Sequence, residues 1–221
     1  FGTACVYFSA KNISTNIDGA MLWTVLHQHA QLLDPKILTI AFVFLLVGYG
    51  TKIGLVPLHF WLPDAHSESP APMSALLSGL LLNIGVYALI RFKILVDPVI
   101  TNQLAGHMIM AFGLLSFLVA GFFIYRQWNI KRMFSYSSIE HMGLIIFAFG
   151  LGSFGSTFVG LFYIILHSLV KSAVFMSVGN VIQFTKSQDM NKIRGLIIMN
   201  PRIGWKLLIG TLAIAGFPPF G

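Results

Sequence analysis

The sequence predicts an all-α polytopic membrane protein with one broken helix. Of its 221 residues, 56% are hydrophobic and only 10% are charged, and the mean hydropathy of +0.81 is far above that of a soluble domain. Several apolar runs reach about 20 residues, the length that crosses a bilayer as a helix. One run is interrupted near its end by Lys52 and Pro57, which predicts a break in that helix.

The elements follow from the apolar runs in chain order. Complete spans are expected at residues 37–57, 72–95, 105–125, 133–152 and 155–184. Residues 1–10 are expected to be the end of an earlier helix, and a last helix is expected to begin at Lys206. As one helix, residues 155–184 would be roughly 45 Å long. This exceeds the hydrocarbon thickness, so the helix must tilt, project or break.

Two polar segments separate these spans. Residues 11–36 are expected to be a loop with a short interfacial helix at residues 21–33, anchored by Trp23. Residues 185–205 are expected to be a cytoplasmic loop. Because the chain starts and stops inside apolar runs, residues 1–221 are interpreted as one transmembrane domain that is an internal fragment of a longer protein.

The distribution of Lys and Arg predicts the orientation. One side of the membrane is expected to carry Lys11, Lys36, Arg91 and Lys93. The other side is expected to carry Arg126, Lys131, Arg132, Lys186, Lys192, Arg194, Arg202 and Lys206. The second side should be cytoplasmic, because cytoplasmic loops are enriched in these residues. This topology explains the formal net charge of +7 better than nucleic-acid binding does, since the basic residues form no face with interleaved aromatics.

The same orientation puts the stretch HFWLPDAHSESPAP in the cytoplasm, where it contributes His59, Asp64, His66 and Glu68. We consider three interpretations: a metal site, a mouth that collects protons, and an ordinary polar turn. The two histidines are seven residues apart across prolines, which is no recognised ligand spacing. The single cysteine, Cys5, excludes an internal disulfide and a cysteine-based metal cluster.

Two lysines remain inside the expected spans. A lysine at the centre of a bilayer helix costs roughly 2.5–3.5 kcal/mol, so it is rare unless it faces protein or water. Lys171 follows His167 by four residues, which places both on one helical face. The alternatives are that Lys52 reaches back to the membrane surface and that His167 is a hydrogen-bonded core histidine.

Further polar groups lie on other helices. Glu140 and His141 fall in the span at residues 133–152, and Asn83 falls at the middle of the span at residues 72–95. The alternatives are that Glu140 pairs with one of the basic residues at positions 131 and 132 and that Asn83 is a helix-packing residue. Together with a proline-broken helix, such groups are typical of a proton or cation pathway.

Four stretches then point to a family: KxxxVPLHFWLPDAHSESPAPMSALLSG, NIKRMFSYSSIEHMG, HSLVKSAVF and LAIAGFPPFG. In this order they resemble the antiporter-like proton-translocating subunits shared by respiratory complex I, Mrp-type cation/proton antiporters and membrane-bound NiFe hydrogenases. Within that family, SSIEHMG together with Asn83 is more similar to component F of hydrogenase-4 or formate hydrogenlyase-type complexes than to complex I subunits.

The resemblance implies a fold of about fourteen helices with two inverted repeats, each containing one broken helix. Lys52 matches the lysine of the first broken helix, and Pro57 lies at the break. His167 and Lys171 match the pair that connects the two half-channels. Asn83 stands where complex I members usually have a bridging lysine. The acidic partner of Lys52 is expected on a helix that precedes Phe1.

The function implied by the resemblance is proton translocation, with Na⁺/H⁺ exchange left open, in a hydrogenase-4, formate hydrogenlyase or NADH dehydrogenase-like complex. The expected partners are other membrane subunits and a peripheral redox arm in a prokaryotic plasma (inner) membrane. No cofactor and no redox chemistry is expected in this chain, which has no nucleotide fingerprint and no Fe–S cysteine set. The alternatives are a passive membrane anchor and a stand-alone secondary transporter.

For the proton path itself, we expect Lys52, Asn83, His167 and Lys171 to form one buried, linear axis at similar membrane depth. Glu140 and His141 are expected to be a side branch through which protons reach this axis.

Overall fold

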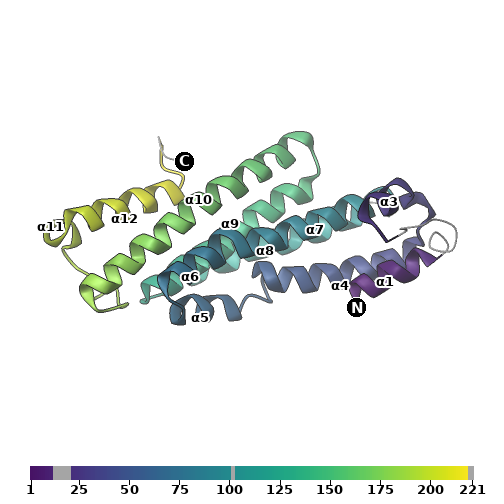
Figure 1. Ribbon diagram of the computed structural model, residues 1–221. Helices are drawn as coiled ribbons and strands as arrows, with labels where there is room; N and C mark the ends of the chain where they lie inside the picture. The colour runs from purple at the N-terminus through teal and green to yellow at the C-terminus, as the bar shows by residue number, and fades with distance from the viewer. Residues whose placement is uncertain (12–20, 101–102, 219–221) are drawn as a thin grey trace.

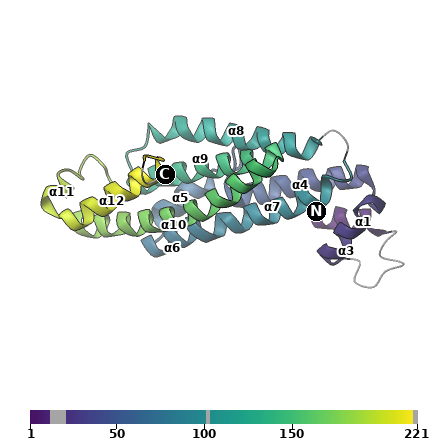
Figure 2. The ribbon, with the colours of Figure 1, turned by 90° about the horizontal axis from the view of Figure 1, so that it is seen from above.

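The computed structural model describes residues 1–11, 21–100 and 103–218. Over these residues the chain is an elongated bundle of helices, most of which run roughly along its long axis (Figures 1 and 2). The helices are α1 (Gly2–Ser9), α3 (Trp23–Gln28), α4 (Pro35–Ile53), α5 (Trp61–Glu68), α6 (Ala71–Leu76), α7 (Leu82–Val96), α8 (Leu104–Ile124), α9 (Ile130–Leu151), α10 (Phe154–Thr185), α11 (Leu196–Met199) and α12 (Pro201–Ile214).

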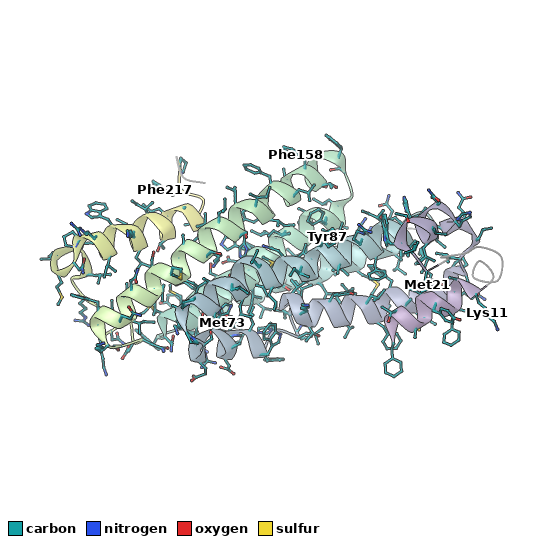
Figure 3. All side chains as sticks on the ribbon, viewed as in Figure 1. Lys11, Met21, Met73, Tyr87, Phe158 and Phe217 are labelled. Carbon is teal, nitrogen blue, oxygen red and sulfur yellow. The ribbon has the colours of Figure 1, made fainter. Side chains whose placement is uncertain are left out.

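Five of the described helical segments are long and apolar enough to cross a membrane, which confirms the predicted all-α membrane class. They are Pro35–Ile53, Ala71–Val96, Leu104–Ile124, Ile130–Leu151 and Phe154–Thr185. The large apolar side chains on their outer faces are exposed, as Phe158 on α10 shows (Figure 3). Such faces suit lipid or other membrane-embedded protein.

The first span begins and ends earlier than residues 37–57. Asp34 caps α4, because its Oδ1 accepts a hydrogen bond from the Lys36 amide at 2.8 Å, and Pro35 occupies the first turn. Gly54 ends α4 in the left-handed conformation, with φ of 83°. The polar segment therefore stops before residue 35, and Lys52 lies in the last turn of α4.

The predicted break lies between α4 and α5. The Val56–Pro57 peptide is cis. The amide of Val56 donates to Ser116 Oγ on α8 at 2.9 Å, and the indole N–H of Trp61 donates to the carbonyl of Thr51 at 2.7 Å. These bonds satisfy backbone groups that the break frees, as a buried non-helical segment requires.

The second span is continuous but changes its winding. α6 passes through a π-helical turn, η2 (Leu77–Leu81), into α7. A π-turn leaves a carbonyl without its usual helical partner. Here the Gly79 carbonyl accepts hydrogen bonds from Asn83 Nδ2 at 2.7 Å and from Ser168 Oγ of α10 at 2.6 Å.

α8 and α9 form a close hairpin. A Cβ atom on Gly143 would lie 2.7 Å from the Gly113 carbonyl oxygen, and one on Gly113 would lie 2.7 Å from that of Gly143. Only glycine lets the two backbones approach so closely. This hairpin holds Ser116 against the break.

α10 is a single continuous helix of 32 residues, about 48 Å long. It begins with a capping box at Ser153 and ends at Lys186 in the left-handed conformation. The helix therefore does not break, which leaves tilt or projection as the ways to fit the bilayer.

The loops gather at two ends of the bundle. At one end, the indole N–H of Trp23 in α3 donates to the Arg91 carbonyl at 3.1 Å, and a short 3₁₀ turn (Ala30–Leu32) follows α3. At the other end, residues 186–190 meet the start of α9 through an isolated antiparallel bridge between Asn129 and Asp189. α11 and the first turn of α12 lie inside the expected loop 185–205, so the last helix starts at Pro201 rather than at Lys206.

Candidate functional site

A line of polar side chains runs along one face of α10. Tyr163, His167 and Lys171 are spaced four residues apart, so they stack on the same face. His167 is 2% exposed and Lys171 is 0% exposed. Buried ionisable groups of this kind are rare and usually functional.

Lys171 is held by α9. Its Nζ donates to the Phe134 carbonyl at 3.1 Å and lies 5.8 Å from the centre of the Phe134 ring. Neither ring nitrogen of His167 has a hydrogen-bond partner among the described residues. An unpartnered buried imidazole is costly unless water fills its hydrogen-bonding positions.

His141 and Tyr163 join α9 to the same line. The Tyr163 hydroxyl and Nδ1 of His141 form a hydrogen bond. The rings of His141 and His167 lie 5.9 Å apart between centroids. The structure thus brings together the two polar sets that the sequence placed on separate helices.

Two adjoining pockets open beside these residues, and we call them the vestibule. Their volumes are about 510 Å³ and about 180 Å³. The polar residues that line them are Ser137, Glu140, His141, Tyr163, His167 and Thr211. Water has room in pockets of this size and would find several polar partners. The vestibule lies between α9, α10 and α12.

Glu140 is half-buried on the vestibule wall and acts electrostatically on Lys171. The alternative pairing of Glu140 with Arg132 or Lys131 is not what the described residues show. Arg132 Nη2 lies 2.9 Å from Asp64 Oδ1, and Lys131 Nζ donates to the Ser69 carbonyl at 2.7 Å. The Glu140 carboxyl group therefore lines the vestibule without an ion pair to Arg132 or Lys131.

Asn83 does not lie on this line. Its pocket, of about 390 Å³, is bordered on α10 by Ile164, Ile165, Ser168 and Leu169. The vestibule is bordered on α10 by Tyr163, Leu166, His167 and Val170. At about 100° per residue, these two sets occupy opposite faces of the helix. Asn83 is half-buried, and its Oδ1 has no partner among the described residues.

Lys52 also departs from the expected buried axis, because its side chain is exposed on this chain. Its neighbour Ile53 touches Gly85 of α7: a Cβ on Gly85 would lie 2.8 Å from Ile53 Cγ1. The end of α4 that carries Lys52 therefore packs against the part of α7 that follows Asn83. The expected single linear axis is not what the described residues show, because Asn83 lies on the far side of α10 from His167.

The four residues of the expected mouth lie on and just before α5, and they divide into exposed and buried pairs. Asp64 and Glu68 are exposed, whereas His59 and His66 are buried. Burial lowers the pKa of His59, against the opposing effect of a hydrogen bond with the Pro57 backbone. Burial, and then the charges of Lys171 and Lys131, lower the pKa of His66 to about 3. Among the described residues, no three His, Cys, Asp or Glu side chains are grouped as metal ligands.

Tyr163 and Ser116 are the residues that sequence reasoning missed. Tyr163 carried a usable signal, because it precedes His167 by the same four residues that separate His167 from Lys171. Ser116 carried none. Its role at the Val56 amide depends on a contact 60 positions away in sequence.

Comparison with known proteins places this geometry in a family. The family model described as NADH:quinone oxidoreductase/Mrp antiporter, TM, matches residues 1–221. The hydrogenase-4 component F homologue of Methylacidiphilum infernorum (isolate V4) is 49% identical over 221 residues, which cover 100% of this chain and 46% of that protein. Chain 4 of the NAD(P)H-quinone oxidoreductase of Prochlorococcus marinus (strain AS9601) is 37% identical over 172 residues, 77% of this chain and 32% of that protein.

A solved structure has the same fold as this chain. A chain of the membrane-bound sulfane sulfur reductase, an archaeal respiratory membrane complex, superposes with a TM-score of 0.89 at 28% identity, covering 98% of this chain and 43% of that chain. The chain thus spans less than half the length of each of these three proteins.

Proposed function

Because the chain belongs to the NADH:quinone oxidoreductase/Mrp antiporter transmembrane family, we propose that it moves protons through the membrane as one subunit of a larger redox complex. The proposed complex is of hydrogenase-4, formate hydrogenlyase or NADH dehydrogenase type, as the similarity to the hydrogenase-4 component F homologue suggests. The electron chemistry would belong to other subunits, and this chain would be the part that moves the ion.

The observation that carries this proposal is the buried line on α10 beside a polar vestibule. Lys171 is fully buried and lies one helical turn from His167. Among the described residues, its hydrogen bond is to the carbonyl of Phe134. A structural lysine would be expected to pair with a carboxylate or to reach the surface. A lysine that must gain and lose a proton needs instead a neighbour such as His167 that exchanges it.

The proton steps follow the contacts. Water in the vestibule would deliver a proton to Glu140 or to the His141–Tyr163 pair, whose hydrogen bond joins α9 to α10. From His141 the proton would pass to His167, whose ring is 5.9 Å away between centroids, through a bridging water. His167 would then protonate the Lys171 amine on the next turn. Each transfer moves one proton and one positive charge.

Lys52, Pro57 and Asn83 would belong to a separate stretch of the path. Lys52 is exposed on a chain that spans less than half of its relatives, so we propose that further helices of the protein cover it and supply its acidic partner. The break at Pro57 leaves carbonyls that water can contact near Lys52. Asn83 would hold water against the Gly79 carbonyl at the π-turn.

The proposed orientation follows the basic residues. The end of the bundle that carries α5 and residues 186–195 would face the cytoplasm of a prokaryotic plasma membrane. A peripheral redox arm and neighbouring membrane subunits would be the partners. We propose H⁺ as the transported ion, since the groups on α10 are an imidazole, a phenol and an amine rather than a set of oxygen ligands.

The test compares Lys171→Met with Lys186→Met in the intact parent complex, reconstituted into sealed vesicles and driven by its own electron donor. Lys186 is exposed after α10, so its loss is the matched control. We expect Lys171→Met to assemble and to lower proton uptake by about tenfold or more, in medium with or without Na⁺. Normal uptake by that variant would favour a passive anchor. Uptake that continues without the electron donor but requires a solute would favour a transporter.

A further inference from the structure

His66 is an unusual buried histidine outside the vestibule. It lies on α5, is 0% exposed, and stacks on Phe175 of α10 with ring centroids 4.5 Å apart and planes 9° from parallel. Neither of its ring nitrogens has a partner among the described residues. A histidine kept only for packing would be replaceable by an apolar ring, and a hydrogen-bonded one would show its partner.

The charged groups that face His66 come from two other helices. They are Lys171 on α10 and Lys131 on α9, and both act electrostatically on the imidazole. Lys131 is 6% exposed, donates to the Ser69 carbonyl and interacts with Glu68 at the end of α5. His66 therefore lies between the polar end of α5 and the buried Lys171.

A polar seam accompanies this arrangement. Lys131, Ser135 and Ser138 lie on one buried stripe of α9. The hydroxyl of Ser138 bonds to that of Ser78 at 2.9 Å and donates to the Phe134 carbonyl at 3.1 Å. That carbonyl also accepts from Lys171.

The hydroxyl of Ser135, in the middle of the stripe, is buried and has no hydrogen-bond partner among the residues that the structure describes. Because a carbonyl accepts but cannot donate, the protein alone does not complete a chain of donors to Lys171. A water molecule beside Ser135 would complete it.

We propose that His66 is a second proton donor to Lys171, fed from the α5 end of the bundle, and that full proton uptake requires it as well as the vestibule. In this step the imidazolium N–H of His66 passes its proton through one water to the lone pair of the Lys171 amine. His66 becomes neutral, Lys171 becomes charged, and a proton from the α5 surface recharges the ring. The inference rests on the proposed function, because Lys171 is the acceptor.

The charge of Lys171 affects when His66 can take up a proton. Burial, and then repulsion by the charge of Lys171, lower the pKa of His66 to about 3, so the ring is neutral at neutral pH. When Lys171 loses its proton, that repulsion disappears and the pKa of His66 rises. His66 is therefore easier to protonate when Lys171 is neutral and can receive a proton, although burial still favours the neutral ring.

The functional test uses His66→Gln and His66→Ala in the intact parent complex in sealed vesicles, with His107→Gln as the control. His107 is exposed on α8, away from both proton routes. We expect the two His66 variants to assemble with their partner subunits and to lower proton uptake by about tenfold. Added imidazole should restore uptake in His66→Ala, which a packing role would not explain.

The outcomes separate the two proposals. Normal uptake in His66→Gln together with loss of uptake in Lys171→Met would overturn the role of His66 alone. Normal uptake in Lys171→Met would overturn the proposed function itself. A readout without any variant is a water-resolving electron cryo-microscopy map of the unmodified complex. An ordered water between His66 and Lys171 is expected there, and an apolar side chain filling that space would exclude the transfer even if the variants fail to assemble.

Discussion

The imidazole rings of His141 and His167 lie 5.9 Å apart between centroids and are tilted by 49°, although the two residues belong to different helices. His141 is fixed by Tyr163, whereas His167 has no partner among the described residues. One histidine is thus oriented by a hydrogen bond within the described chain and the other is not. This asymmetry suits a relay in which one ring delivers a proton and the other passes it on.

Tyr163→Phe is expected to slow proton uptake. The variant keeps the ring that packs between α9 and α10 but removes the hydroxyl that orients His141. Loss of one such hydrogen bond should slow uptake by about three- to tenfold, measured in vesicles that contain the intact complex. Tyr136→Phe is the matched control, because Tyr136 stacks on Phe123 and does not line the vestibule. Equal rates in the two variants would remove Tyr163 from the path.

Glu140→Gln is expected to slow proton uptake by about tenfold or more while the complex still assembles. The amide keeps the size of the carboxyl group but cannot carry a proton between the vestibule and the line on α10. Rates come from vesicle assays and assembly from co-purification of partner subunits. Failure to assemble would instead identify Glu140 as a structural ion-pair partner of Lys171.

Lys52→Arg is expected to assemble and to stop proton transfer. Arginine keeps the positive charge for an acidic partner but stays protonated at any accessible pH, whereas lysine can release its proton. The measurement is proton uptake driven by the electron donor of the complex. Near-normal uptake would mean that Lys52 is a fixed counter-ion or a surface anchor, since arginine has a comparable reach.

Gly143→Ala is expected to destabilise the α8–α9 hairpin. The new methyl group would lie 2.7 Å from the Gly113 carbonyl oxygen and 2.8 Å from the Phe117 amide nitrogen, so the backbones must separate, at a cost of about 1–3 kcal/mol. Thermal unfolding in detergent measures the effect as a lower midpoint.

The matched control for this hairpin is Gly48→Ala in α4, because a Cβ on Gly48 meets no atom within 4 Å. Its expected effect is a small gain of about 0.5–1 kcal/mol from helix propensity. An unchanged midpoint for Gly143→Ala would show that the hairpin can loosen without cost.

The sequence by itself determined the features that depend on short-range periodicity. Apolar runs of spanning length fixed the class and the five spans to within a few residues, because hydrophobic length is read locally. The spacing of four between His167 and Lys171 fixed their common face for the same reason. The break after Lys52 could also be predicted, because Pro57 cannot donate a backbone hydrogen bond within a helix.

Only the tertiary structure decided which faces meet. Asn83 of α7 packs against one face of α10, whereas His167 lies on the opposite face. The close α8–α9 hairpin brought Ser116 to the amide of Val56. No local pattern encodes such contacts, because they depend on how helices far apart in sequence pack. The same packing turned His66 from a residue of a polar turn into a buried ring that stacks on Phe175 and lies within the electrostatic reach of Lys171.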